Sequence, residues 1–263
     1  MPRFAANISL LYPEHALVQR IDAAARDGFA AIEVQSPYAV DAAEFRRGLD
    51  SARAEVVLIN APVGDFAGGE RGLAALPGRE SEFDASIDRA LDYARTVGAP
   101  RVHVMAGTPG ADVAHADALA AYERNIARAC DVLAPHGIAV MIEPINPHDF
   151  PGYFLNRLPL AVATIARLAN PGLALQFDVY HLQILQGDLI RHLRQHFEVI
   201  GHVQVAGVPD RNEPDTGEVN CTAIFRELDR LRYAGWVGCE YRPVRGMQAG
   251  GTSAGLGWLK PYL

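Results

Sequence analysis

The sequence predicts an α/β fold in which residues 1–263 form a single (β/α)8 barrel. Eight short β-rich runs alternate with longer amphipathic helical patterns from one end of the chain to the other. This alternation is typical of parallel strands joined by helical crossovers, and a length of 263 residues fits one barrel of about 250 residues. The alternative is an open doubly wound sheet, but the sequence lacks the GxGxxG turn expected after an early strand of that fold.

Each predicted strand is a short β-rich run. The strands are expected at Phe4–Leu10, Ala31–Gln35, Val56–Ala61, Arg101–Ala106, Ala139–Ile145, Leu173–Asp178, Gly201–Ala206 and Trp236–Tyr241.

The predicted helices repeat apolar residues every three or four positions. They are expected at Leu17–Arg26, Ala43–Ala54, Glu82–Val97, Ala116–Ala134, Pro159–Leu168 and Thr222–Tyr233. One long irregular stretch, Pro62–Glu80, follows the third strand. Loops of this length are usually lids or binding loops, and the alternative is a solvated insertion.

The composition narrows the class of protein. A net charge of -7 disfavours a nucleic-acid surface, which needs a basic stripe. The three cysteines are far apart and suggest neither a disulfide framework nor a metal knot. No signal h-region is present, and no apolar run approaches about 18 residues. We expect a cytoplasmic protein that acts on a small molecule, binds neither nucleic acid nor membrane, and is able to form a homo-oligomer.

The last four predicted strands each carry a polar residue near the carboxyl end. These residues are Glu143, Asp178, Gln204 and Glu240. In such barrels the active site is built from the carboxyl ends of several strands. Converging buried carboxylates need a cation or protons, and an all-oxygen set suits Mg2+ or Mn2+ better than zinc. A single strand-end glutamate is more often a salt-bridge partner or a solvated cap, but four consecutive strands favour a shared metal site.

Several long irregular segments resemble a known family. They include RFAANISLL, NAPVGDFAGGERGLAALPGRESEF, IEPINPHDFPGYFL, FDVYHLQ, GHVQVAGVPDRNEPDTGEVN and GWVGCEYRP. Over essentially the whole chain the sequence resembles the hydroxypyruvate isomerase family, within the xylose isomerase-like barrels. The opening MPRFAAN, VHVMAG and VAGVPDR look more like a sister group that isomerises 2-oxo-tetronates.

The resemblance implies an activity and a set of site residues. It implies that Glu143, Asp178, Gln204 and Glu240 hold the metal and that Glu143 and Glu240 transfer the proton. The implied reaction interconverts hydroxypyruvate and 2-hydroxy-3-oxopropanoate (tartronate semialdehyde), and the implied alternative substrate is a 2-oxo-tetronate.

The chemistry of this reaction assigns further roles. Moving the carbonyl from C2 to C3 requires removal of a proton from C3 and its return to C2 through an enediol, which a metal would stabilise. Glu143 and Glu240 lie across the barrel mouth from each other and could carry that proton.

Four more residues are expected to bind the substrate. His181 is expected to hydrogen-bond a substrate oxygen, and Arg211 to meet the carboxylate in a bidentate pair. Glu70 and Arg71 of the long loop are expected to approach the substrate. The alternatives are a structural histidine, a solvated arginine and a local partner for Glu70.

Other functions remain open. A keto-sugar 3-epimerase would use the same enediol chemistry on a longer substrate, although similar epimerases usually carry histidine at the position of Gln204. A DNA-repair endonuclease should have a histidine-rich zinc mouth and a basic face, which the charge disfavours. A binding module without catalysis would bind metal without turnover.

Overall fold

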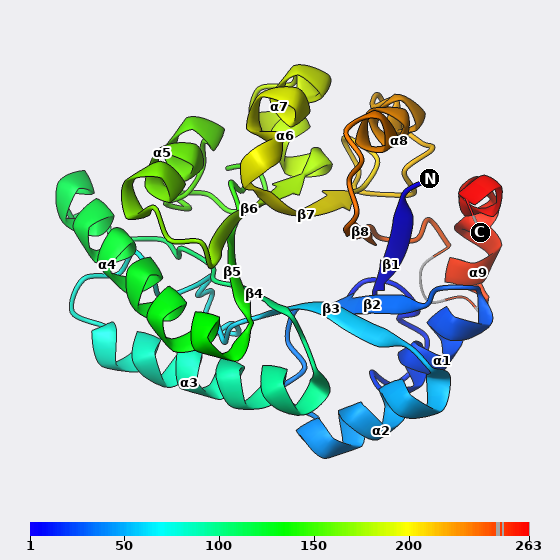
Figure 1. Ribbon diagram of the computed structural model, residues 1–263, viewed down its shortest axis with the longest axis horizontal. Helices are drawn as coiled ribbons and strands as arrows, with labels where there is room; N and C mark the ends of the chain where they lie inside the picture. The colour runs from blue at the N-terminus through cyan, green and yellow to red at the C-terminus, as the bar shows by residue number, and fades with distance from the viewer. Residues whose placement is uncertain (246–247, 249, 263) are drawn as a thin grey trace.

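A closed barrel of eight parallel strands forms the centre of the computed structural model, which describes residues 1–245, 248 and 250–262 (Figure 1). Neighbouring strands pair in chain order, and β1 closes the barrel by pairing with both β2 and β8. The strands are β1 Arg3–Asn7, β2 Ala31–Val34, β3 Glu55–Asn60, β4 Arg101–His103, β5 Ala139–Ile142, β6 Leu173–Asp178, β7 Ile200–Val205 and β8 Trp236–Cys239. The predicted (β/α)8 barrel is therefore confirmed.

Helices surround the strands in Figure 1. They are α1 Gln19–Arg26, α2 Ala42–Ala52, α3 Glu80–Val97, α4 His115–Leu133, α5 Leu158–Leu168, α6 Val179–Leu185, α7 Leu189–His196, α8 Cys221–Arg230 and α9 Gly251–Gly255. Three short 3-10 segments cover Ala134–His136, Phe197–Val199 and Leu256–Tyr262. Among the described residues no helix is both long and apolar enough to cross a bilayer.

The predicted elements are all found; β6 has its predicted bounds, β3 and β7 are shifted by one residue, and the other strands are shorter than predicted. Prediction extended the fourth strand to Ala106, but pairing in β4 ends at His103. The reason is that the backbone of Ala106 bonds elsewhere: its carbonyl accepts from Ala75 N at 2.7 Å, and its N–H donates to the Tyr153 hydroxyl at 2.8 Å.

Helices α6 and α7 lie between β6 and β7, where the sequence analysis assigned none. Asp178 ends β6 and caps α6, because its Oδ1 accepts the backbone N–H of Tyr180 at 2.8 Å. His181 consequently stands in the first turn of α6 and is buried.

The inner face of the barrel changes from apolar to polar toward the carboxyl ends of the strands. Ala5, Ala31 and Met141 belong to a small apolar cluster separate from the main core. The residues two positions further along the same strands point to the same face. These residues are Asn7, Glu33 and Glu143, which are polar.

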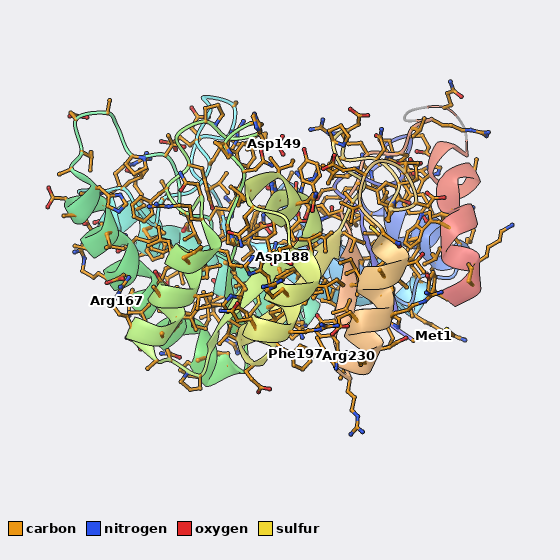
Figure 2. All side chains as sticks on the ribbon, turned by 90° about the horizontal axis from the view of Figure 1, so that it is seen from above. Met1, Asp149, Arg167, Asp188, Phe197 and Arg230 are labelled. Atoms are coloured by element: carbon orange, nitrogen blue, oxygen red, sulfur yellow. The ribbon has the colours of Figure 1, made fainter. Side chains whose placement is uncertain are left out.

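Figure 2, turned by 90°, shows the two ends of the barrel. Asp149 of the β5–α5 loop lies at one end, and Phe197, just before β7, lies at the other.

Candidate active site

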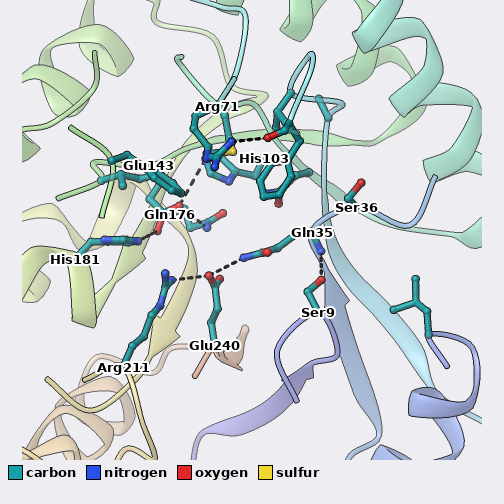
Figure 3. Close-up of a pocket in the computed structure, with 18 of the residues that line it drawn as sticks. Ser9, Gln35, Ser36, Arg71, His103, Glu143, Gln176, His181, Arg211 and Glu240 are labelled. Carbon is teal, nitrogen blue, oxygen red and sulfur yellow. Dashed lines mark hydrogen bonds and ion pairs between the residues drawn. The ribbon is translucent and has the colours of Figure 1, made fainter. Parts of the chain in front are cut away.

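A cavity of about 480 Å3 opens at the carboxyl ends of the strands. Glu143, His181, Arg211 and Glu240 of the predicted site line it, as does Arg71 of the long loop (Figure 3). Asp178 and Gln204 lie beside these residues, buried behind the described lining. The predicted convergence of four strand ends at one mouth is therefore what the barrel produces.

Glu240 follows β8 and is 5% exposed. Its Oε1 accepts from Gln35 Nε2 at 2.8 Å and from Arg211 Nη2 at 2.5 Å. These two donors reach it from opposite sides in Figure 3. Its Oε2 accepts from Gln204 Nε2. Burial raises the pKa of Glu240 to about 8 even though Arg211 opposes the shift, so this carboxyl group can exchange a proton near neutral pH.

Glu143 follows β5 and is 4% exposed. Its Oε2 accepts from Gln176 Nε2 at 3.0 Å and lies 3.6 Å from His103 Nε2. Its Oε1 is buried without a hydrogen-bond partner. Burial, together with the charges of Asp178 and Glu240, raises the pKa of Glu143 well above its ordinary value. An unpaired buried carboxylate oxygen needs a proton or a cation.

Arg211 is the internal counter-charge of the site. Its Nη2 lies 3.3 Å from Asp178 Oδ2 and 2.5 Å from Glu240 Oε1, and its Nη1 lies 3.8 Å from Asp149 Oδ2. The guanidinium also stacks over Tyr180, 4.8 Å from the ring centre. Burial raises the pKa of Asp178 to about 6, while Arg211 opposes this shift. Three carboxylates already face Arg211, so its predicted contact with a substrate carboxylate stays a prediction.

The tautomer of His181 follows from Asn146. The Asn146 oxygen accepts from the backbone N–H groups of His148 and Asp149, both at 3.0 Å. The Asn146 amide nitrogen therefore faces His181 Nδ1, at 2.7 Å. Burial, then the charge of Arg211, lowers the pKa of His181 well below its ordinary value. A neutral ring that accepts at Nδ1 carries its hydrogen on Nε2, which lies 3.6 Å from Asp178 Oδ2.

Glu143, Asp178 and His181 offer ligand atoms within 4.8 Å of one another. The unpartnered Glu143 oxygen and the carboxylate-rich surroundings fit a divalent cation. Two members of this cluster belong to the predicted metal set. Of the other two predicted ligands, Glu240 lies outside the cluster, and Gln204 donates its amide N–H to Glu240.

The loop Pro62–Glu80 lies at the cavity mouth, as predicted, because its Val63, Phe66 and Arg71 line the cavity. An isolated bridge pairs Gly72 with Ala106. A Cβ on Gly72, whose φ is +118°, would lie 2.3 Å from the Met105 carbonyl oxygen, so glycine permits this close approach.

Arg71 stacks on Phe66 at 4.1 Å and faces Phe150 at 5.4 Å. Its Nη1 donates to the carbonyl oxygens of Phe66 and Glu70. Among the described residues it pairs with no carboxylate, unlike Arg211. The Glu70 side chain instead bonds Arg79 and accepts the Asp65 N–H at 2.6 Å. Glu70 thus pairs locally, as the alternative to substrate binding predicted, and its contact with the substrate stays a prediction.

Several polar residues of this site were not singled out from the sequence, and four of them make the hydrogen bonds or close contacts described here. They are Gln35, His103, Asn146 and Gln176, of which all but Asn146 line the cavity. The rule of strand ends could have found Gln35, which directly follows β2. The period-two rule could have found Gln176, which shares a strand face with Asp178.

Comparisons with known proteins agree with this fold. A family model described as a xylose isomerase-like TIM barrel matches residues 21–262. The 2-oxo-tetronate isomerase of Cupriavidus necator is 52% identical over 263 residues, 100% of this chain and 99% of the relative. The hydroxypyruvate isomerase of Escherichia coli is 38% identical over 262 residues, 100% of both chains. A crystal structure from Brucella melitensis, titled AP endonuclease family 2, matches with a TM-score of 0.95 and 42% identity over 100% of this chain and 99% of that chain.

The chain therefore belongs to the xylose isomerase-like TIM barrel family. Its full-length relatives confirm the predicted resemblance to hydroxypyruvate isomerases and the prediction of an isomerase.

Proposed function

We propose that the protein interconverts the keto and aldehyde forms of a short hydroxy-oxo acid, with hydroxypyruvate as the predicted substrate. The observation that carries the proposal is the pair of buried glutamates, Glu143 and Glu240, which face one cavity from β5 and β8. Burial raises the pKa of each carboxyl group, which suits groups that must both hold and release a proton near pH 7.

The two glutamates divide the proton transfer between them. One carboxylate removes the proton from C3 of hydroxypyruvate while the C2 carbonyl oxygen gains a proton, and an enediol forms. A carboxyl group then delivers a proton to C2 while the hydroxyl on C3 loses its proton, and the aldehyde forms at C3 with no net gain or loss of protons. The roles of Glu143 and Glu240 reverse with the direction of the reaction.

His181 and Arg71 orient the substrate in this proposal. The Nε2–H of His181 donates to a substrate oxygen, which agrees with the tautomer that Asn146 sets. Arg71 receives the substrate carboxylate, because it lines the cavity and its charge has no carboxylate partner among the described residues. Arg211 keeps Asp178 and Glu240 in place. An anion entering beside three carboxylates needs such a free cation.

Glu143 and Asp178, common to the predicted set and to the cluster, would hold a divalent ion. The predicted ligand Gln204 instead turns its amide nitrogen toward Glu240, the fourth predicted ligand. When bound, Mg2+ or Mn2+ would act as a Lewis acid that stabilises negative charge on the substrate oxygens.

A 2-oxo-tetronate is the second candidate substrate. The relative at 52% identity bears that name, whereas the hydroxypyruvate isomerase of Escherichia coli is 38% identical. The cavity of about 480 Å3 has room for either acid. Both share the same carbonyl, neighbouring hydroxyl and carboxylate, so the same residues serve either substrate.

The test is turnover of the purified protein on hydroxypyruvate and on a 2-oxo-tetronate, before and after treatment with a chelator. We expect the carbonyl to move between C2 and C3 in at least one acid, which gives an aldehyde from hydroxypyruvate and a 3-oxo acid from the 2-oxo-tetronate, and a larger kcat/KM identifies the preferred one. Absence of turnover on both acids, with and without added Mg2+ or Mn2+, would refute the proposal.

A further inference from the structure

A buried acid lies below the cavity and takes no part in the proposed reaction. Glu33 on β2 and His202 on β7 are each 0% exposed, and neither belongs to the described cavity lining. Glu33 Oε2 lies 2.6 Å from His202 Nε2. Glu33 Oε1 accepts from Asn7 Nδ2 at 2.9 Å and from Gln204 Nε2 at 2.7 Å. A carboxylate this deep is costly unless it is fully hydrogen-bonded, and both oxygens are.

The backbone makes room for this acid. A Cβ on Gly238 of β8 would lie 2.3 Å from Glu33 Oε2, so any larger residue there would displace the carboxylate. The register of β2 on β3 shifts between Ile32 and Glu33, and that of β6 on β7 shifts between Leu175 and Gln176. Such irregularities re-aim side chains beside active sites.

The hydrogen bonds give the two glutamine amides a fixed direction. A primary amide has two N–H groups and one oxygen. Both N–H groups of Gln204 donate to carboxylates, those of Glu33 and Glu240. Its oxygen therefore accepts from Gln176 Nε2, at 2.6 Å. The second N–H of Gln176 donates to Glu143, at 3.0 Å. One acceptor at the base thus orients two amides that reach both glutamates of the site.

We propose that Glu33 is a positioning residue that holds the amides of Gln204 and Gln176 in this direction. The functional need rests on the proposed function, in which Glu143 and Glu240 gain and lose a proton. Both glutamates line the cavity and take part in that reaction, so the direction of the amides has to be set by an acceptor outside the cavity. Glu33 lies outside the cavity lining, and its Oε1 accepts from Gln204, an arrangement in which one amide N–H is aimed at each glutamate.

The experiment compares three variants. Glu33→Leu removes the acceptor, and kcat should fall about 10- to 100-fold, the usual effect of losing a partner behind a catalytic group, while KM changes less than about 3-fold. Glu33→Gln should keep kcat within about 3-fold, because its oxygen can accept from Gln204 and Asn7 while its nitrogen faces His202. His202→Leu breaks the same buried pair but leaves the amide chain intact, so it should also keep kcat.

A second measurement needs no substrate. In the wild-type protein the side-chain N–H signals of Gln176 and Gln204 in NMR spectra should be protected from exchange with solvent, since both groups are buried and bonded. The protection should persist in Glu33→Gln and His202→Leu and disappear in Glu33→Leu. If the wild-type protein turns over neither acid, the proposed function fails, but this exchange measurement still decides the positioning.

The proposal is overturned if Glu33→Leu keeps both kcat and protected amides. It is equally overturned if His202→Leu loses as much kcat as Glu33→Leu, because a general packing role would then suffice. Should Glu33→Leu fail to fold, the other two variants decide: retained kcat with protected amides in both supports the proposal, and loss in either overturns it.

Discussion

Replacing Glu240 by glutamine should remove a loss of stability that the wild-type protein undergoes as pH rises. A substitution of an exposed glutamate should have no such effect. Burial raises the pKa of Glu240 from 4.5 to about 8. Between these values the folded protein binds a proton that the unfolded chain releases. The free energy of unfolding therefore falls as pH rises through this window. At about 1.4 kcal/mol per pKa unit, the full loss above pH 8 is on the order of 5 kcal/mol.

Glutamine has no charge to bury, so Glu240→Gln should lose this part of the slope. We expect the variant to unfold at higher urea concentration than the wild-type protein at pH 9, with the difference shrinking toward pH 5. The measurement is urea unfolding from pH 5 to 9 in the presence of a chelator, because a bound divalent ion favours the charged carboxylate. Glu198→Gln at an exposed position is the control and should leave the slope unchanged.

The reasoning fails if Glu240→Gln has the wild-type slope, or if it is less stable than the wild-type protein at pH 9. Either result would mean that Arg211 and Gln35 compensate the buried charge fully, so that desolvation is not the dominant effect. Burial would then not explain how Glu240 could carry a proton near neutral pH.

Three further predictions concern activity and binding. Glu240→Gln and Glu143→Gln should each lower kcat by about 10²–10⁴, and the double variant should be little worse than either. In D2O the newly protonated carbon should carry deuterium. Full activity in either single variant, or complete retention of the substrate hydrogen, contradicts the two-glutamate transfer. Arg71→Gln should raise KM for the acid about 10-fold or more, because a charge-assisted hydrogen-bonded pair is lost. The control Arg95→Gln, at an exposed position, should leave KM unchanged. Equal KM values for Arg71→Gln and the wild-type protein contradict the assignment of Arg71 to the substrate carboxylate. The affinity for Mn2+, measured by titration calorimetry, should rise from pH 6 to 8, because Glu143 and Asp178 must lose protons to bind the ion. Asp178→Asn should weaken this affinity. An affinity that does not change with pH contradicts a metal site at these two carboxylates.

The fold could be predicted because its signal is repeated along the whole chain. Each strand end also carries a local signal, so Glu143, Asp178 and Glu240 could be placed at one mouth because each stands near the carboxyl end of its strand. Helix α6 could not be predicted in the same way, because it begins directly at the strand end, and its start depends on Asp178 acting as a cap. For that reason the direction of His181 became clear only in the structure.

Contacts between residues on strands that are far apart in the chain could not be predicted from local sequence patterns. Glu33 and His202 lie 169 positions apart in the chain, and neither residue has a neighbour in sequence that points to the other. Gly238 gives a hint, since a glycine on the inner face of a strand leaves space for something. In the structure the Glu33 carboxylate fills that space.

The charge balance of the site modifies the argument for a metal. From the sequence, three converging carboxylates required a cation or protons, and the all-oxygen set favoured the metal. In the structure Arg211 supplies one positive charge against Asp178 and Glu240. Burial also raises the pKa of Glu240 to about 8 and that of Glu143 well above its ordinary value, which favours their protonated forms. Charge alone therefore does not demand a divalent ion here. What still favours one is geometry, because Glu143 Oε1 is buried and unpartnered within a cluster of ligand atoms that lie 4.8 Å or less apart.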